Sequence, residues 1–222
     1  MNNEKKKLVI FDLDGTLLNT ITDLGQAANY ALEKNGYATH HLSSYPHFVG
    51  NGIRKLIERV LPAEDRDEAT VEKLRGDFME YYNEHLTDTT TPYPGIEDML
   101  RDLQAAGVKM AVATNKYQEA ATRLILHFFP YISWVAIAGQ IEGVPVKPDP
   151  SVVFRILGEY PTAKHDVMMV GDSGVDMETA RRACVESTGV SWGFRSVAEL
   201  TEAYADHIIN APDELVKIVG AE

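Results

Sequence analysis

The sequence predicts an α/β protein in which a doubly wound parallel sheet is interrupted by an all-helical insert. After residue 95, short apolar runs alternate with segments of helical periodicity, which is the pattern of a parallel sheet connected by helices. These apolar runs do not alternate with polar residues, as expected of strands covered on both faces. Residues 19–88, which follow the first apolar run, contain helical patterns but no obvious strand. Together these observations indicate a Rossmann-like core with a helical insert after its first strand.

The first strand is expected at residues 7–11, because this β-branched and aromatic run stops at a turn formed by Asp14 and Gly15. Three helices are expected in the insert that follows. In the first of them, Asp23 and Gln26 form a candidate capping pair and Gly36 a candidate stop. The apolar residues that recur at helical spacing in the insert are Leu24, Ala27, Ala28, Ala31 and Leu32, then Ile53, Leu56, Ile57, Val60 and Leu61, then Val71, Leu74, Phe78, Tyr81 and Tyr82.

The second half of the chain begins after a linker at residues 89–95, which two prolines stiffen. Helices are expected at residues 96–106, 119–127, 151–158 and 175–183. Strands are expected at residues 108–113, 134–138 and 167–170, with weaker candidates at 185–190 and 207–209. We therefore assign residues 1–18 and 89–222 to an α/β core and residues 19–88 to a helical cap domain.

Composition and charge narrow the classes of protein that the chain can represent. It has 222 residues, of which 45% are apolar and 24% charged, as in ordinary globular proteins. Lysine and arginine number 21 against 33 for aspartate and glutamate, so the formal net charge is −12. Nucleic acid and anionic membrane surfaces repel such a chain at long range, so neither is an expected partner.

Three sequence features favour a cytoplasmic protein. The single cysteine, Cys184, cannot form an internal disulfide, which fits a reducing compartment. Residues 8–11, the apolar run after the first lysines, are too short to form the core of a signal peptide. No apolar run approaches the roughly 18 residues of a membrane span. We expect a cytoplasmic protein that is a monomer or a weak homodimer.

Chemically active side chains follow the expected strands at the points where those strands end. Ligands in open α/β sheets bind beyond the carboxyl ends of the strands, so these side chains should converge on one edge of the sheet. The residues in these positions are Asp12 and Asp14, then Thr114 and Asn115, then Lys147 in the loop before the next helix, then Asp172 and Asp176.

This combination of residue types predicts phosphoryl chemistry. Clustered carboxylates repel each other unless a cation neutralises them, and hard oxygen ligands suit Mg²⁺. A threonine hydroxyl and a lysine ammonium are good donors to phosphate oxygens. We therefore expect Mg²⁺-dependent phosphoryl transfer to a carboxylate, with a small phosphorylated metabolite as the partner.

Four short motifs, in this order, resemble those of the haloacid dehalogenase-like hydrolases. They are residues 12–16, Asp-Leu-Asp-Gly-Thr; residues 114–115, Thr-Asn; residues 147–148, Lys-Pro; and residues 171–176, Gly-Asp-Ser-Gly-Val-Asp. The resemblance covers nearly the whole chain, including the helical insert after the first motif. Within that superfamily, residues 48–52, 114–116 and 189–194 look most like phosphoglycolate phosphatases.

The resemblance implies a role for each residue of these motifs. Asp12 would be the nucleophile that forms an aspartyl-phosphate, and Asp14 the general acid and base. Thr114 would bind a phosphate oxygen, and Lys147 would bridge the nucleophile and the transferring phosphoryl group. The predicted metal ligands are Asp12, the backbone carbonyl of Asp14 and Asp172, with Asp176 in or just outside that shell.

The predicted substrate-binding residues are Gly50, Asn51, Arg54, Thr114, Asn115 and Lys116. The Gly50-Asn51-Gly52 turn offers backbone N–H groups without large side chains, which suits close approach to a carboxylate. Arg54 is a candidate to hold that carboxylate bidentately, with a solvated helix charge as the slightly preferred alternative. The expected substrate is 2-phosphoglycolate.

Alternative functions remain open at this stage. Within the same superfamily they are a sugar-phosphate phosphatase, a pyrophosphatase and a phosphomutase similar to β-phosphoglucomutase. A signalling receiver domain also gathers acidic residues, a threonine and a lysine around Mg²⁺, but a small receiver carries no long helical insert beside its aspartate. A non-catalytic scaffold has no physical reason to retain uncompensated like charges.

Overall fold

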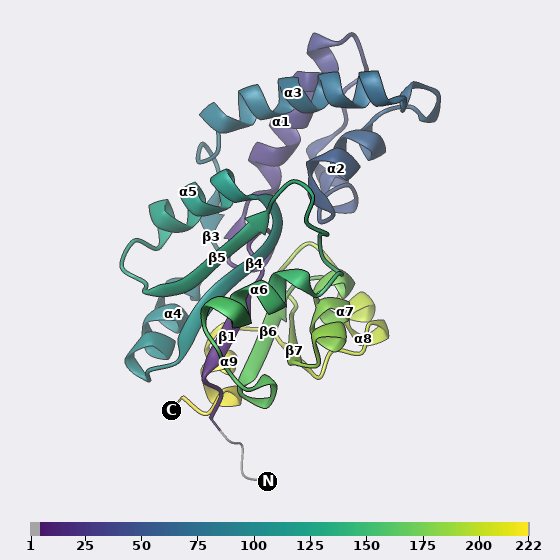
Figure 1. Ribbon diagram of the computed structural model, residues 1–222. Helices are drawn as coiled ribbons and strands as arrows, with labels where there is room; N and C mark the ends of the chain where they lie inside the picture. The colour runs from purple at the N-terminus through teal and green to yellow at the C-terminus, as the bar shows by residue number, and fades with distance from the viewer. Residues whose placement is uncertain (1–4, 222) are drawn as a thin grey trace.

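A six-stranded parallel sheet forms the centre of the molecule (Figure 1). The computed structural model describes residues 5–221. In spatial order the strands are β5 (Trp134–Gln140), β4 (Lys109–Tyr117), β1 (Leu8–Phe11), β6 (Val167–Gly171), β7 (Glu186–Val190) and β8 (His207–Ile209). The predicted α/β class and parallel sheet are therefore confirmed.

The central strand β1 is buried on both faces, which explains its unbroken apolar sequence. Leu8 and Ile10 belong to the apolar cluster on one face, and Val9 and Phe11 to the cluster on the other. Helices α6 (Ser151–Glu159) and α7 (Gly174–Ala183) supply the first cluster. Helices α4 (Ile96–Ala105), α5 (Gln118–Phe128) and α9 (Asp213–Ile218) supply the second. The sheet is thus covered by helices on both sides, as a doubly wound fold requires.

The register of β1 brings three segments to the same edge of the sheet. Phe11 lies opposite Val112 of β4 and Val170 of β6. The residues that follow Phe11 and Val170 therefore leave the sheet side by side. The sequence had suggested that Thr114, Asn115 and Lys116 follow this strand. In the structure, strand β4 continues to Tyr117, so all three residues lie within it.

The three helices of the insert pack beyond that edge, at the top of Figure 1. They are α1 (Ile21–Lys34), α2 (Gly52–Val60) and α3 (Glu68–Glu84), with short 3₁₀ helices at Leu42–His47 and Ala63–Asp65. The sequence predicted no strand within residues 19–88; the described chain between residues 20 and 90 forms none, but Asn19 belongs to a short strand. Where the chain enters and leaves the insert, two short strands, β2 (Leu18–Asn19) and β3 (Thr91–Pro92), pair with each other. The second falls within the predicted linker.

The predicted capping role of Asp23 is wrong. Thr20 is the N-cap residue of α1, and the Asp23 side chain is buried. Its carboxylate accepts hydrogen bonds from the backbone N–H groups and the hydroxyls of both Thr89 and Thr90, at 2.5–3.1 Å. This carboxylate therefore joins the first helix of the insert to the segment by which the chain returns to the core.

The sequence did not reveal helix α8 (Val197–Glu202), α9 or the short 3₁₀ helix at Lys164–Asp166. Both α-helices are six residues long, too short for a clear periodicity of apolar side chains. Within residues 5–221, every helix is too short or too polar to cross a membrane.

Candidate active site

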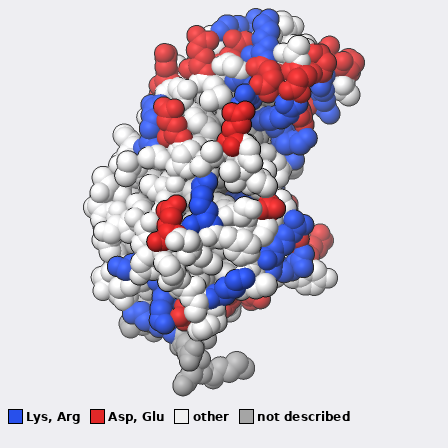
Figure 2. Space-filling view, viewed as in Figure 1, with Lys and Arg blue, Asp and Glu red and all other residues white. Residues whose placement is uncertain are grey.

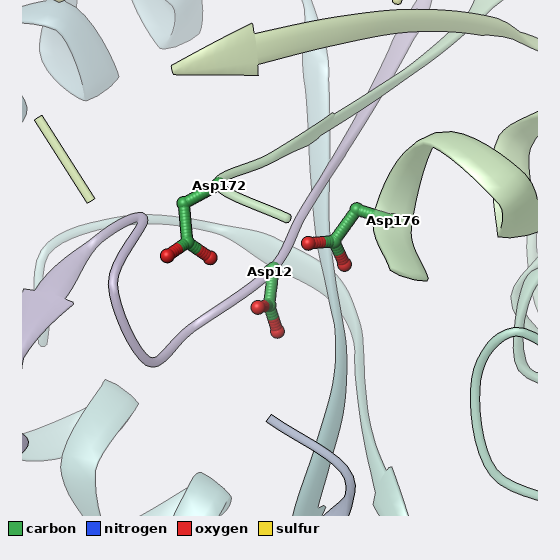
Figure 3. Close-up of side chains that lie close together, drawn as sticks. All are labelled: Asp12, Asp172 and Asp176. Atoms are coloured by element: carbon green, nitrogen blue, oxygen red, sulfur yellow. The ribbon is translucent and has the colours of Figure 1, made fainter. Parts of the chain in front are cut away.

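Three carboxylates converge where β1 and β6 end (Figure 3). Asp12 follows β1, Asp172 follows β6, and Asp176 lies in the first turn of α7. All three are buried, and an oxygen from each lies within 4.8 Å of the others. The register of β1 and β6 accounts for this meeting, because Phe11 and Val170 are directly paired.

Lys147 neutralises part of this negative charge. Its ammonium lies 2.8 Å from Oδ1 of Asp12 and 2.6 Å from Oδ1 of Asp176, and its side chain is 2% exposed. Asn115 fixes the loop that carries it: Asn115 Oδ1 accepts from the Lys147 N–H at 2.8 Å, and Nδ2 donates to the Lys147 carbonyl at 3.1 Å. The lysine is therefore held from both its backbone and its side chain.

The pKa values of these groups reflect an excess of buried negative charge. Burial raises the pKa of Asp12 to about 7, with Lys147 opposing the rise and Asp176 adding to it. Burial and repulsion from Asp176 and Asp12 also raise the pKa of Asp172 well above its usual value. Burial acts to lower the pKa of Lys147, but the attraction of Asp12 and Asp176 outweighs it and the pKa rises. One lysine does not balance three carboxylates.

The chemistry of these donors fits Mg²⁺. Hard carboxylate oxygens in a compact buried group are the ligands that Mg²⁺ takes, and a divalent cation would offset the remaining charge. Both oxygens of Asp176 have partners, Lys147 on one side and the N–H and hydroxyl of Ser173 on the other. Among the described residues, Oδ2 of Asp12 and Oδ1 of Asp172 have no hydrogen-bond partner, so these two are the more available ligands.

Asp14 lies beside this group and is held by two donors. Lys116 Nζ donates to its two carboxylate oxygens at 2.9 and 3.1 Å, and the Thr20 hydroxyl donates to Oδ1 at 2.7 Å. The hydroxyl oxygen of Thr114 accepts from the N–H of Lys116 at 3.2 Å, which leaves its proton available to a ligand.

These side chains line a pocket between the sheet edge and the insert. Gly50 lines it too, with φ of 108°, and its carbonyl accepts from Asn115 Nδ2 at 3.0 Å. The core contributes Asp12, Asp14, Thr114, Asn115, Lys116, Tyr117, Lys147, Asp172, Ser173, Asp176, Phe194 and Arg195. The insert contributes Leu24, Val49, Gly50, Gly52, Ile53, Leu56 and Tyr82.

The structure does not bring Arg54 or the side chain of Asn51 to this pocket. The Arg54 guanidinium pairs with Glu68 at 2.5 Å and, less closely, with Glu58 and Glu72. Figure 2 shows charged side chains of both signs gathered on the insert, at the top of the view. The Oδ1 atom of Asn51 accepts from Arg59 at 2.6 Å. The prediction that Arg54 holds the substrate is therefore replaced by its alternative, a solvated helix charge.

Arg195 and Tyr82 are among the pocket residues that had not been predicted as site residues. Arg195 lies on the loop after β7 and donates to the carbonyls of Pro46 and Val49, so it ties this loop of the core to the insert. It directly follows residues 189–194, a segment already singled out in the sequence. Tyr82 belongs to the third apolar helical stripe of the insert, a pattern that predicts packing. Helical periodicity correctly indicates that it is buried, but carries no signal that it faces a pocket.

Comparison with known proteins agrees with this geometry. The sequence model of the family described as "Haloacid dehalogenase-like hydrolase" matches residues 9–190. The chain is 33% identical over 217 residues to the phosphoglycolate phosphatase of Nitrosospira multiformis, covering 96% of this chain and 95% of that protein. It is 35% identical over 208 residues to that of Agrobacterium fabrum, covering 91% and 88%.

A solved structure extends the agreement to the whole fold. A predicted phosphoglycolate phosphatase from Haemophilus somnus superimposes with a TM-score of 0.88 at 26% identity, covering 97% of this chain and 98% of that one. The match therefore includes the insert as well as the sheet. On these grounds the chain belongs to the haloacid dehalogenase-like hydrolase family.

Proposed function

We propose that this protein hydrolyses 2-phosphoglycolate, a small phosphate monoester, with Mg²⁺ and through an aspartyl-phosphate on Asp12. The observation that carries the proposal is the position of Asp12. It ends the central strand, its Oδ1 pairs with Lys147 at 2.8 Å, and Asp172 and Asp176 lie close by. A buried carboxylate so placed can be presented to phosphorus while positive charge remains next to the transferring group.

In the first step, a carboxylate oxygen of Asp12 attacks phosphorus in line and the bond from phosphorus to the glycolate oxygen breaks. Asp14 gives a proton to that leaving oxygen, because an alkoxide is a poor leaving group. Lys147 and the hydroxyl of Thr114 hold the phosphoryl oxygens. The products of this step are glycolate and phosphorylated Asp12.

In the second step, water attacks the phosphorus of the aspartyl-phosphate. Asp14 now accepts a proton from that water, and phosphate leaves with the Asp12 carboxylate restored. The donors Lys116 and Thr20 support this role, because they fix the orientation of the Asp14 carboxylate. Asp12, Asp172 and the backbone carbonyl of Asp14 would hold Mg²⁺, with Asp176 outside the shell. When bound, Mg²⁺ would offset negative charge on the phosphoryl oxygens.

Support for phosphoglycolate comes from the relatives and from the pocket. The curated relatives are named phosphoglycolate phosphatases. Residues of the core and of the insert line the pocket together, which suits a small leaving group. Lys116, with 3% of its side chain exposed, supplies a buried positive charge close to Asp14.

We also propose that residues 19–88 form a cap domain that moves against the core. The chain crosses between the two at β2 and β3, so closure would turn on few residues and would exclude water from the site. Hydrogen exchange at residues 17–19 and 87–91 should slow when Mg²⁺ and a phosphate analogue bind. Unchanged exchange at both segments would argue against closure.

A panel of phosphate monoesters tests the substrate. We expect the kcat/KM of the Mg²⁺-loaded protein to be highest for phosphoglycolate among phosphoglycolate, ethyl phosphate, a hexose phosphate and pyrophosphate. A higher value for the hexose phosphate or for pyrophosphate would overturn the substrate and leave the chemistry at Asp12 standing. An absence of turnover on the panel and on p-nitrophenyl phosphate would overturn both.

A further inference from the structure

The insert's side of the pocket is apolar with one exception. Leu24, Val49, Ile53 and Leu56 present hydrocarbon, and the two glycines present backbone. Among the described residues, Tyr82 is the one residue with a polar side-chain group that the insert contributes to the pocket lining. Any polar side-chain contact between the insert and a substrate must therefore come from Tyr82 in this arrangement.

That hydroxyl has no hydrogen-bond partner among the described residues, although the side chain is completely buried. Buried polar groups are nearly always paired, and an unpaired hydroxyl destabilises the fold unless a ligand or water satisfies it. Two other buried groups share this condition, the Thr16 hydroxyl and the Trp134 indole N–H, but neither residue lines the pocket. Tyr82 alone combines an unpaired donor with a place in the site.

Charged groups of both signs surround Tyr82. Lys116 Nζ lies 4.8 Å from the centre of the tyrosine ring, and the same ammonium holds Asp14. Phe78 packs against the ring at 5.3 Å between centroids, which fixes its orientation. Burial, together with Asp14 and Asp23, raises the pKa of Tyr82 well above its usual value, so the hydroxyl keeps its proton and can donate.

We propose that Tyr82 is a specificity-determining residue whose hydroxyl donates a hydrogen bond to the carboxylate of the substrate. This inference rests on the proposed function, because it concerns the same pocket and assumes phosphoglycolate. The phosphoryl group must lie at Asp12, where the core supplies Thr114 and Lys147. The insert faces the other side of the pocket and meets the leaving group, which in phosphoglycolate ends in a carboxylate that only accepts hydrogen bonds.

Tyr82→Phe isolates the hydroxyl, because it keeps the ring under Lys116 and removes one oxygen. We expect kcat/KM for phosphoglycolate to fall by about 10- to 100-fold, the scale of a hydrogen bond to a charged group. For ethyl phosphate, which has the same length but no carboxylate, we expect a change of no more than about two-fold. In the Asp12→Asn background, which should bind without turnover, the Kd for phosphoglycolate with Mg²⁺ should rise by the same factor.

Tyr81→Phe is the matched control, because Tyr81 is the neighbour on α3, lies outside the pocket lining and stacks on Tyr30. It should match the wild type on both substrates. Equal losses on both substrates in Tyr82→Phe would show a structural role, and an unchanged preference for phosphoglycolate would show that the hydroxyl does not read the carboxylate. Either result overturns the inference and leaves the proposed function intact. A wild type with no preference for phosphoglycolate over ethyl phosphate would overturn the substrate proposal and this inference with it.

Discussion

Two groups of ion pairs, one at the sheet edge and one on the insert, have nearly the same distances and opposite surroundings. Lys147 and Asp176 are 2.6 Å apart with side chains 2% and 1% exposed. Arg54 and Glu68 are 2.5 Å apart with side chains 45% and 70% exposed. Exposed pairs contribute little because water and salt screen them, whereas a buried charge that loses its partner is strongly destabilising. Distance alone therefore does not identify the pairs that matter to the protein.

The largest contrast between the regions should appear in Asp12→Asn. An amide is a far weaker nucleophile than a carboxylate, so kcat for a phosphate monoester should fall by at least about 10⁴-fold. The fold should persist, because the change removes one charge from a crowded acidic group. Asp98→Asn, at an aspartate with an 82% exposed side chain, is the control and should keep the wild-type rate. Wild-type turnover by Asp12→Asn would show that another residue is the nucleophile.

Lys147→Met should have the next largest effect, on both activity and stability. It leaves Asp12 and Asp176 buried without their cation, so the free energy of unfolding should fall by about 3–5 kcal/mol. Without Lys147 to oppose the rise, the pKa of Asp12 increases further, and the folded state binds more protons than the unfolded chain. The loss should therefore be greater at pH 8 than at pH 6, as denaturant titrations at the two values would measure. A loss that does not change with pH would mean that Lys147 acts through packing.

Mg²⁺ should stabilise the wild type in a pH-dependent way. With the pKa of Asp12 raised to about 7, the folded metal-free protein holds a proton that the unfolded chain releases above about pH 4. Its stability therefore falls as the pH rises from about 4 through 7, and binding of Mg²⁺ to the ionised carboxylates offsets this loss. At a Mg²⁺ concentration of about 100 times Kd, the gain at pH 8 should be about 2.7 kcal/mol, and smaller at pH 5.5.

Thermal melts with Mg²⁺ or a chelator, in the wild type and in Asp172→Asn, measure this effect. The variant lacks one of the available carboxylates and should lose most of the gain. The metal site would be wrongly placed if Asp172→Asn gained as much stability from Mg²⁺ as the wild type does.

A buried carboxylate outside the site extends the comparison to the crossing between core and insert. Asp23→Ala removes the acceptor for the N–H groups and hydroxyls of Thr89 and Thr90, so the free energy of unfolding should fall by about 2–3 kcal/mol. Exchange of the amide protons at residues 87–91 should accelerate.

Asp67→Ala is the matched control for Asp23→Ala. Its carboxylate also accepts from two backbone N–H groups and a threonine hydroxyl, but at the exposed start of α3. The loss should be smaller there, because water can replace the lost acceptor. Equal losses at the two positions would mean that burial does not decide the effect.

A contact in this molecule can be predicted from the sequence when both of its residues lie on a helix or strand or at the end of one. Asp12 and Asp172 could be placed together because each ends a strand of one parallel sheet, and such ends share an edge. The partners of Asp23 could not be predicted in this way, because Thr89 and Thr90 lie 66 and 67 residues away in the sequence and outside the helices and strands. Periodicity indicated that Tyr82 is buried, but the docking of the insert on the core decides whether a buried side chain meets packing or a pocket.

Arg54 shows the same limit and gives the smallest expected effect. Its position two residues after Gly52 suggested a substrate contact, yet three glutamates, Glu58, Glu68 and Glu72, surround its guanidinium. Two of them come from α3, which no spacing within α2 could reveal. Because the pairs are exposed, Arg54→Ala should change the melting temperature by no more than about 2 °C.

The same variant should leave kcat/KM for phosphoglycolate within about two-fold of the wild type, since the Arg54 side chain does not line the pocket. Steady-state kinetics of Arg54→Ala should be compared with those of Arg195→Ala, because Arg195 does line the pocket. If Arg54→Ala lost activity on phosphoglycolate but not on ethyl phosphate, Arg54 would have to leave its glutamates and enter the pocket during turnover. The core would then no longer supply all the cations of the site, because the insert would bring one of its own.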